Sequence, residues 1–386
     1  MYRASVTCGI AVVGILVADA HGQASAPFFM GLGDLPGGEY GCWPRGISAD
    51  GSTVTGYGAG PAGFEAFRWT RADGMVGLGH LPGEGASAYG YAASANGSVI
   101  VGFGNRSMHN CEAIRWEGGI LTNLGDLPGG TVESYASSVS ADGRVVAGNS
   151  VSGLGEEAFR WTADTGMVGL GDLPGAGVDS RGTAVSADGS VVVGMGTTDR
   201  GTEAMRWSAE QGMVGLGLLP GGLSDGMAWG VSADGSVVVG QSLTPKGYEA
   251  FRWTENAGMV GLGDLDGGNF DSRAYDVSAD GSVIVGGSYP IAGSGDPFIW
   301  DSMHGLRDLR SVLEIECGLD LTGWTLGAAM SVSDDGGTMI GSGINPDGVP
   351  EGWIAQLPEP ATALLMILGA GGALKRRWRP ECQERR

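Results

Sequence analysis

The side chains that could carry chemistry in this sequence recur at a regular spacing. Counting back five and three residues from the serine of each Ser-Ala-Asp phrase leads to large aromatic or basic residues. These are Trp43, Arg45, Tyr89, Tyr91, Tyr135, Arg181, Trp229, Arg273 and Tyr275. Alternate positions of a strand share one side, so the set would form one surface. Such a surface suits sugar rings and acidic glycans, through stacking and bidentate hydrogen bonds; the alternative is packing between repeats.

The usual catalytic sets are missing from the sequence. There are only 4 His and 5 Cys, and His80, His109 and His304 occupy unlike positions. We find no Ser-His-Asp set and no glycine-rich phosphate loop that opens a helix, and we predict no cofactor. A binding module is therefore favoured. The alternative is a carbohydrate-active enzyme, a glycosidase or lyase, with Tyr89, Tyr91 and His109 as its candidates at the central mouth of the fold.

Seven similar phrases place an acidic or amide residue before glycine. This residue is Asp50, Asn96, Asp142, Asp188, Asp234, Asp280 or Asp335. Calcium needs six to eight oxygen ligands, whereas each phrase offers one carboxylate, so we interpret the phrases as turns and predict no metal. They resemble the Asp-box of sialidase propellers but lack one residue before the glycine and the final Trp. Since Asp-boxes are structural, no glycosidase activity is implied.

The elements that position these residues come from a repeat. The intervals between the seven positions are 46 residues, except for a last interval of 55. Two further phrases, Glu-Ala-Phe-Arg-Trp and Gly-Leu-Gly-Asp-Leu, recur with the same period, which indicates a repeat architecture. The 75 Gly and 16 Pro are then explained by turns, because 42% hydrophobic residues and 11 Trp are enough to form a core.

Each copy contains four short segments rich in Val, Ile, Phe and Trp, which predict strands. In the fourth complete copy these are residues 183–186, 190–194, 203–207 and 213–219. Seven copies of four strands predict an all-β fold, a seven-bladed β-propeller over residues 28–357.

The two ends of the repeat predict how the ring closes. The seventh copy stops after its third strand, 351–357, and the chain begins with an unmatched fourth strand, 28–35. We expect the two to pair and complete the last blade, which leaves no long sheet edge exposed. The one helical segment expected is the insert around 308–319.

Connection lengths indicate where a unique site would lie. Turns at Ala-Asp-Gly and after Trp-Thr are short, whereas the connections from second to third strand and between copies look longer and vary. In an up-and-down blade both variable connections emerge on one face, and we expect the binding surface there. Residues present in every copy belong to the architecture, so we expect the Glu and Arg of Glu-Ala-Phe-Arg-Trp to pair within or between blades.

The two ends of the chain read as sorting segments. A basic start, an apolar run and a small-residue cleavage site make residues 1–20 a predicted signal peptide. Residues 358–379 combine a Pro-Glu-Pro phrase, an apolar stretch and a basic cluster, followed by a basic and polar tail at 380–386. The defining residues are Pro358, Glu359, Pro360, Arg376 and Arg377.

This C-terminal arrangement resembles the PEP-CTERM sorting signal of bacteria, and the alternative is a plain membrane anchor. The resemblance implies processing by an exosortase, a membrane protease-transpeptidase tied to extracellular polysaccharide production. We therefore expect export across the inner membrane, transient association with that membrane, and release to the cell surface or extracellular matrix.

The repeats over residues 28–357 resemble the HAF-repeat family of extracellular bacterial proteins. The His of the family's His-Ala-Phe phrase is replaced by Glu65, Glu112, Glu157, Glu203 and Glu249. The role of that family is not established, so the resemblance implies the fold and an exported location only.

Charge and cysteine content complete the sequence-based expectations. A formal net charge of −21 excludes a general affinity for nucleic acid, which needs a basic face. Export to an oxidising compartment would permit one disulfide among Cys42, Cys111 and Cys317. We predict Cys42–Cys111, because both lie in connections on the same face of neighbouring blades, with Cys42–Cys317 as the alternative.

Overall fold

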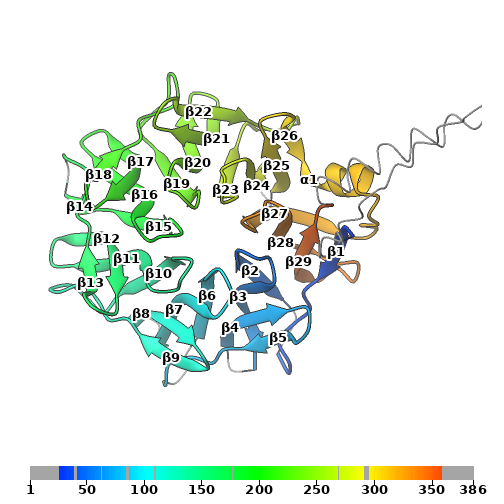
Figure 1. The fold of residues 1–386 in the computed structure, drawn as a ribbon, viewed down its shortest axis with the longest axis horizontal. Helices are drawn as coiled ribbons and strands as arrows, with labels where there is room; N and C mark the ends of the chain where they lie inside the picture. Colours follow the sequence, from blue (N-terminus) through cyan, green and yellow to red (C-terminus); the bar gives the residue numbers. More distant parts are fainter. Residues whose placement is uncertain are drawn as a thin grey trace, which may run out of the picture. The chain divides into compact units, whose positions relative to one another are not determined.

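The computed structural model describes residues 26–38, 41–61, 63–83, 87–107, 110–175, 177–267, 269–290 and 295–358. A compact unit runs from Pro27 to Leu357, and in it seven antiparallel sheets stand around a central axis (Figure 1). The predicted seven-bladed β-propeller is confirmed.

The first three blades follow the chain, from the channel outward. Blade 1 is β2 (Cys42–Ile47), β3 (Thr53–Gly60), β4 (Gly63–Thr70) and β5 (Gly74–Gly77). Blade 2 is β6 (Ser87–Ala93), β7 (Val99–Ser107), β8 (Asn110–Glu117) and β9 (Ile120–Asn123). Blade 3 is β10 (Ser134–Val139), β11 (Val146–Ser152), β12 (Gly155–Thr162) and β13 (Gly166–Gly169), with β14 (Val178–Asp179) added parallel to β12.

The remaining blades repeat this order. Blade 4 is β15 (Arg181–Val185), β16 (Val191–Thr198), β17 (Gly201–Ser208) and β18 (Gly212–Gly215). Blade 5 is β19 (Gly226–Val231), β20 (Val237–Thr244), β21 (Gly247–Thr254) and β22 (Gly258–Gly263). Blade 6 is β23 (Ser272–Val277), β24 (Val283–Ser288), β25 (Asp296–Asp301) and β26 (Gly305–Asp308). Blade 7 is β27 (Thr325–Val332), β28 (Thr338–Ile344), β29 (Pro350–Gln356) and β1 (Phe28–Gly31).

The strand boundaries differ from the prediction in one informative way. In blade 4 the second and third strands are longer than expected, and they meet at Thr198 and Gly201 across a two-residue turn. The connection from second to third strand is therefore tight in most blades, not long. The expectation was wrong because the polar residues after the Val-Val-Gly segment continue the ladder instead of leaving it.

The expected closure of the ring is confirmed. β1 pairs antiparallel with β29 as the outermost strand of blade 7. The expected helical insert is also present, as the short α1 (Leu309–Ser311) and the π-helix η1 (Val312–Glu316). Leu309 and Leu313 of this insert are fully buried in a hydrophobic cluster formed with residues of blades 6 and 7.

The repeated turns join neighbouring blades. In blade 4, Asp188 Oδ1 accepts hydrogen bonds from Ser186 Oγ at 2.7 Å and from Ser190 N at 2.9 Å. Gly189 has a φ of 74°, and a Cβ added there would meet Val145 of blade 3. The glycine is thus required both by the backbone conformation and by the close approach of the preceding blade.

A ring of backbone hydrogen bonds links the blades at these turns. Six N–H groups donate to the carbonyl of the corresponding residue in a neighbouring blade, at 2.9–3.0 Å. The donor–acceptor pairs are Ala95–Ala141, Ala141–Ala187, Ala187–Ala233, Ala233–Ala279, Ala279–Asp334 and Asp334–Ala49. We call these residues the alanine collar.

The repeated Glu and Arg have separate structural roles. Glu157 Oε1 accepts from the N–H of Gly171 in its own blade at 2.8 Å. Arg160 Nε donates to the carbonyl of Gly189 in the next blade at 3.0 Å. The arginine thus joins blades, whereas the glutamate closes the end of the fourth strand. The two do not pair with each other in the contacts that the structure describes.

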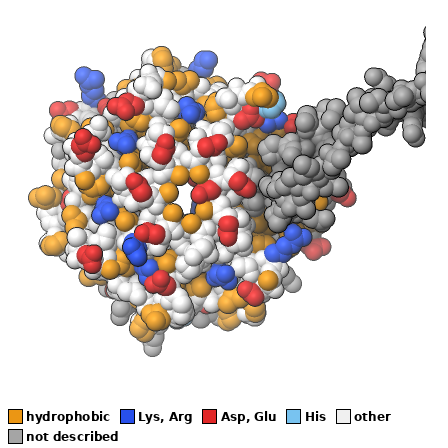
Figure 2. Space-filling view, in the orientation of Figure 1, with side chains coloured by type: hydrophobic (Ala, Val, Ile, Leu, Met, Phe, Trp, Pro, Cys, Tyr) orange, Lys and Arg blue, Asp and Glu red, His pale blue; other side chains and the backbone are white. Residues whose placement is uncertain are grey.

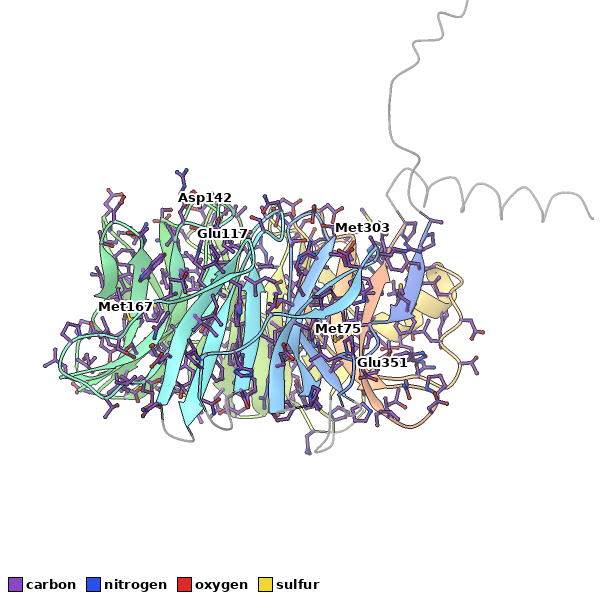
Figure 3. The ribbon with its side chains drawn as sticks, turned by 90° about the horizontal axis from the view of Figure 1, so that it is seen from below. Met75, Glu117, Asp142, Met167, Met303 and Glu351 are labelled. Atoms are coloured by element: carbon purple, nitrogen blue, oxygen red, sulfur yellow. The ribbon has the colours of Figure 1, made fainter. Side chains whose placement is uncertain are left out.

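The two faces of the ring carry different loops. The Asp-Gly turns and the turns between third and fourth strands lie on one face, which we call the Asp-turn face; Figure 3 places Asp142 and Glu117 together on it. The opposite face, which we call the mouth face, carries the connections between blades and the turns between second and third strands. Figure 2 views the Asp-turn face, and acidic side chains surround its centre.

The predicted sorting segments fall largely outside the described residues. Residues 1–25 and 359–386 are not described, so the signal peptide and all but Pro358 of the sorting motif have no structural account here. Within the described ranges, no helix has the length and apolar character needed to span a membrane.

Candidate functional site

The predicted surface residues lie on the innermost strands of six blades. Along β10 the residues alternate between buried and half-buried, with Ser134 and Ala136 buried and Tyr135 half-buried between them. β19 and β23 show the same alternation at Trp229 and Arg273. All nine predicted positions are half-buried or exposed in this way. The nine side chains are therefore at least partly accessible on the inner strands of their blades.

An aromatic arc covers the wall of blades 1 to 3. Trp43 stacks on Tyr57 with ring centroids 5.4 Å apart, and Tyr57 lies 4.9 Å from Tyr89. Tyr89 stacks on Phe103 at 4.7 Å, and Phe103 lies 4.8 Å from Tyr135. These five residues, which we call the aromatic arc, join three blades through ring contacts. Trp43, Tyr89 and Tyr135 of the predicted surface thus take part in packing between blades, which was the alternative to a sugar-binding role.

Arginines lie over rings at two places on the same wall. The Arg45 guanidinium lies 5.6 Å from the Tyr57 ring centroid. Arg273 lies 4.8 Å from the Tyr289 ring, and it forms an ion pair with Asp271 at 3.0 Å. Both arginines are thus engaged with neighbouring groups.

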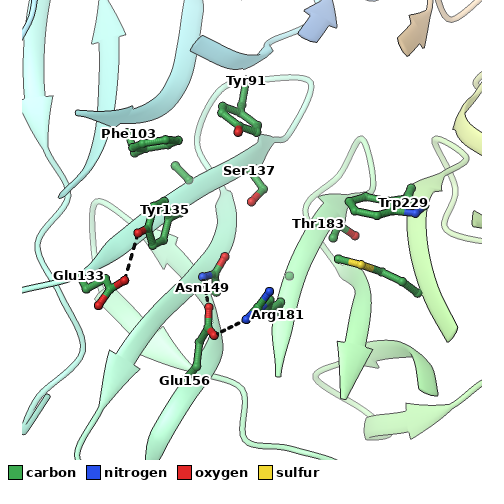
Figure 4. Close-up of a pocket in the computed structure, with 13 residues that line it drawn as sticks. Tyr91, Phe103, Glu133, Tyr135, Ser137, Asn149, Glu156, Arg181, Thr183 and Trp229 are labelled. Atoms are coloured by element: carbon green, nitrogen blue, oxygen red, sulfur yellow. Dashed lines mark hydrogen bonds and ion pairs between the residues drawn. The ribbon is translucent and has the colours of Figure 1, made fainter. Parts of the chain in front are cut away.

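A cavity of about 430 Å³ opens between the arc and blade 5 (Figure 4). Its volume lies within the range of about 300–1,000 Å³ typical of small-molecule sites. Tyr91, Phe103 and Tyr135 border it on one side and Trp229 on the other, with Arg181 between them. Four predicted residues therefore meet at one site, namely Tyr91, Tyr135, Arg181 and Trp229. The other five, Trp43, Arg45, Tyr89, Arg273 and Tyr275, do not line this cavity.

Polar side chains of the cavity lining form two hydrogen-bonded groups. Arg181 Nη2 forms an ion pair with Glu156 Oε2 at 2.7 Å, and Asn149 Nδ2 donates to Glu156 Oε1 at 2.6 Å. Tyr135 Oη donates to Glu133 Oε1 at 3.1 Å. Burial, together with Cys111 and Glu133, raises the pKa of Tyr135, so its hydroxyl stays protonated. The cavity thus combines aromatic walls with fixed donors and acceptors.

Several cavity residues were missed by the sequence reasoning. Phe103 and Asn149 occupy the same slot of the second strand, seven residues after the turn Asn or Asp, where Tyr57 stands in blade 1. They face the inner-strand residues as register partners, Tyr89 with Phe103 and Tyr135 with Asn149. This position varies among otherwise similar copies, and that variation could have identified Phe103 and Asn149 from the sequence.

The predicted disulfide is not present, because the cysteines face different neighbours. Cys42, Cys111 and Cys317 are all free. Cys42 is fully buried, and its Sγ lies 3.1 Å from the Gly33 carbonyl and 3.2 Å from the Gly352 N–H, toward blade 7. Cys111 lies beside Tyr135 on the side of blade 3. Placement in neighbouring blades did not fix the directions of the two side chains.

The described histidines lie apart from the cavity. His304 pairs with Asp301, and His80 Nδ1 lies 3.0 Å from the Leu81 carbonyl. His109 lies outside the described residues. Among the residues that the structure covers, no group of three or more His, Cys, Asp or Glu is arranged to hold a metal ion.

No protein-family model matches the chain, and no curated protein matches it. Its structure is similar to those of solved β-propellers. An oligogalacturonate lyase from Vibrio parahaemolyticus is 12% identical, with a TM-score of 0.53, and the match covers 88% of this chain and 99% of that one.

TolB from Acinetobacter baumannii is 12% identical with a TM-score of 0.45 over 68% of this chain, which spans only 60% of the TolB chain. The SapL1 lectin, solved with alpha methyl fucoside, is 14% identical with a TM-score of 0.41, over 70% of this chain and 96% of that one. At such identities the lyase likeness shows the β-propeller fold alone.

Proposed function

We propose that the protein is an exported β-propeller that binds a glycan in the cavity between blades 2 and 5. The observation that carries the proposal is the arrangement of rings and polar groups there. Trp229 borders the cavity opposite Tyr91, Phe103 and Tyr135, while Arg181, Glu156 and Asn149 lie between them. Sugar rings present apolar C–H faces and hydroxyl edges, which match aromatic walls and planar polar side chains respectively.

The binding mechanism follows from the fixed side chains of the cavity. The Arg181–Glu156 ion pair and the Asn149–Glu156 hydrogen bond hold three planar groups in place before a ligand arrives. Preformed groups lose little conformational entropy on binding. Free acceptor sites on Glu156 and Asn149 would then receive hydroxyl protons of the sugar, while the rings cover its faces.

Export and surface location remain proposals that rest on the sequence. The signal peptide, the Pro-Glu-Pro phrase and the basic cluster support translocation and processing by an exosortase as a partner. In this proposal the propeller reaches the cell surface or extracellular matrix, where extracellular polysaccharide is available as a ligand.

A glycan array with the unit Pro27–Leu357 tests the proposal. Binding should be lost or fall at least about fivefold in Trp229→Ala, since stacking on one half-buried ring contributes about 1 kcal/mol or more. Trp43→Ala is the matched control, because Trp43 belongs to the aromatic arc but does not line the cavity. Equal losses in the two variants would contradict the cavity as the binding site.

The alternative of a carbohydrate-active enzyme is tested with the same glycans. Reducing-end release or formation of unsaturated products, measured over time, would reveal a glycosidase or a lyase. Turnover that disappears on changing one residue of the inner wall, for example Tyr89→Phe or Tyr91→Phe, would replace the binding proposal by the enzymatic one.

A further inference from the structure

We infer that the cavity takes a neutral sugar unit and discriminates against uronic acids and other anionic sugars. The inference rests on the proposed function and names the ligand class of that site. It narrows the sequence-based expectation, which included acidic glycans because arginines are interspersed among the rings. The placement of the charges inside the cavity carries the inference.

The only basic side chain of the described cavity lining is already neutralised. The lining contains one arginine, Arg181, and two carboxylates, Glu133 and Glu156. Arg181 is held by Glu156 at 2.7 Å, so its charge is balanced within the wall. Glu133 accepts a hydrogen bond from the Tyr135 hydroxyl, and no basic group pairs with it among the contacts that the structure describes. The described lining therefore carries one net negative charge.

Further acidic residues occupy the equivalent position of the next blades. Glu133 lies two residues before Tyr135 on the mouth face, and the corresponding residues are Asp179, Asp225 and Asp271 in blades 4 to 6. Only Asp271 forms an ion pair with an arginine among the described contacts of this group. An anionic ligand that approaches the cavity would thus meet several carboxylates, and like charges in a partly desolvated site repel strongly.

The hydrogen-bonding groups of the cavity also favour neutral hydroxyls. Carboxylates accept hydrogen bonds and cannot donate them when ionised. Glu133 and Glu156 can therefore receive protons from sugar hydroxyls but offer nothing to a sugar carboxylate. Tyr135 directs its hydroxyl proton to Glu133. A carboxylate ligand would find in Arg181 a guanidinium whose charge Glu156 already balances through Nη2.

The aromatic walls do not distinguish a neutral sugar from an acidic one, so selection between the two depends on charge. Trp229 and the rings of Tyr91, Phe103 and Tyr135 can cover the faces of a hexose and of its uronic acid equally well. Stacking explains why a sugar binds, whereas the carboxylates select which sugar. The two contributions can be separated with ligands that differ only in charge.

Binding of matched ligand pairs to the unit Pro27–Leu357 tests the inference by calorimetry. The pairs are oligogalacturonate as free acid and as methyl ester, and a cello-oligosaccharide with and without oxidation of its primary hydroxyls. We expect the neutral member of a pair to bind at least about tenfold more tightly, with a gap that narrows at high salt because charge repulsion is screened.

Each outcome separates the inference from the proposed function. Equal or tighter binding of the acidic members overturns the inference and leaves the glycan-binding function standing. Absence of binding to both neutral members overturns the inference, and absence of binding to every glycan on the array overturns the proposed function as well.

The source of the discrimination is tested with two variants of equal charge change. Glu133→Gln removes the unbalanced charge but keeps an acceptor for the Tyr135 hydroxyl, so the acidic ligands should gain affinity relative to the neutral ones. Glu210→Gln, in an exposed turn on the Asp-turn face, should leave the preference as it is. A preference that is the same in both variants would refute the electrostatic explanation.

Discussion

Phe28 of β1 lies opposite Gln356 of β29, so residues from the two ends of the propeller are register partners in one sheet. The pairing continues to Gly31, which lies opposite Trp353. Leu32 and Leu35, just after β1, are almost fully buried beside blade 1. The first strand is therefore both the outer edge of the last blade and part of the packing of the first.

Deletion of the first strand should open the ring. A chain that starts at Pro36 exposes the edge of β29 and the apolar surface that Leu32 and Leu35 cover. We expect a lower and broader thermal transition by calorimetry than in a chain that starts at His21. Superimposable transitions for the two chains would show that β1 does not close the propeller.

Substitution of a turn glycine should reveal the contact between blades. In Gly143→Ala the added Cβ meets Val99 of blade 2 while the backbone keeps a φ of 74°, so we expect a loss of about 2–4 kcal/mol in urea unfolding. Gly171→Ala is the matched control, because its φ is 77° but no atom lies within 4 Å of the new Cβ. It should lose only the strain, about 1–2 kcal/mol. Equal losses of unfolding free energy in the two variants would mean that Val99 moves aside without cost.

Asp276 should make the stability of the fold depend on pH between about 4 and 6. Its carboxylate accepts hydrogen bonds from Ser331 Oγ and Val332 N of blade 7, and burial raises its pKa from 3.8 to about 6. The raised pKa means that the folded protein favours the neutral acid. The stabilisation of the folded state by neutral Asp276 is complete below pH 3.8 and is lost as the pH rises through about 6. The free energy of unfolding falls by about 2–3 kcal/mol over this range.

The Asp276→Asn variant isolates this contribution. The amide oxygen can accept the hydrogen bonds from Ser331 and Val332 without a charge, so the stability of the variant relative to the native protein should increase as the pH rises from about 4 to 6. Asp164→Asn, at an exposed turn, is the control. A stability difference between Asp276→Asn and the native protein that does not change with pH would contradict the assignment.

The thiols should react according to their burial. Cys42 is fully buried, and burial raises its pKa to about 12, so it should not react with a thiol reagent at pH 8 in the folded protein. Cys111 and Cys317 are half-buried and should react, with Cys317 slowed because burial raises its pKa. Peptide mapping without reduction provides the check: a linked Cys42–Cys111 peptide would contradict the structure.

The fold could be predicted because every copy of the repeat carries the residues that form its own turns. Each Ser-Ala-Asp-Gly phrase sets a turn with its own side chains, as in the bonds of Asp188 to Ser186 and Ser190, so local residues suffice to predict it. Closure by residues 28–35 followed from counting strands. These features require no knowledge of how blades face each other.

The cavity depends on contacts that the repeat does not encode. Tyr135 was predicted from its spacing, but its neighbours Phe103 and Asn149 come from the second strands of two different blades. Their meeting depends on the twist of each sheet and on the packing between blades. The same limit explains the cysteines, since the direction of Cys42 toward Gly352 is set by the closing strand and not by its loop.

The alanine collar makes the copies of the repeat interchangeable as building units. Its contacts use backbone atoms and the short phrase that nearly every copy shares, so they do not depend on which copy stands beside which. Residues of the mouth face can then diversify without disturbing the assembly of the ring. A gene in which two of the 46-residue units are exchanged should encode the same scaffold with its ligand-contacting residues in a new order, which makes this propeller a template for shuffling binding specificities.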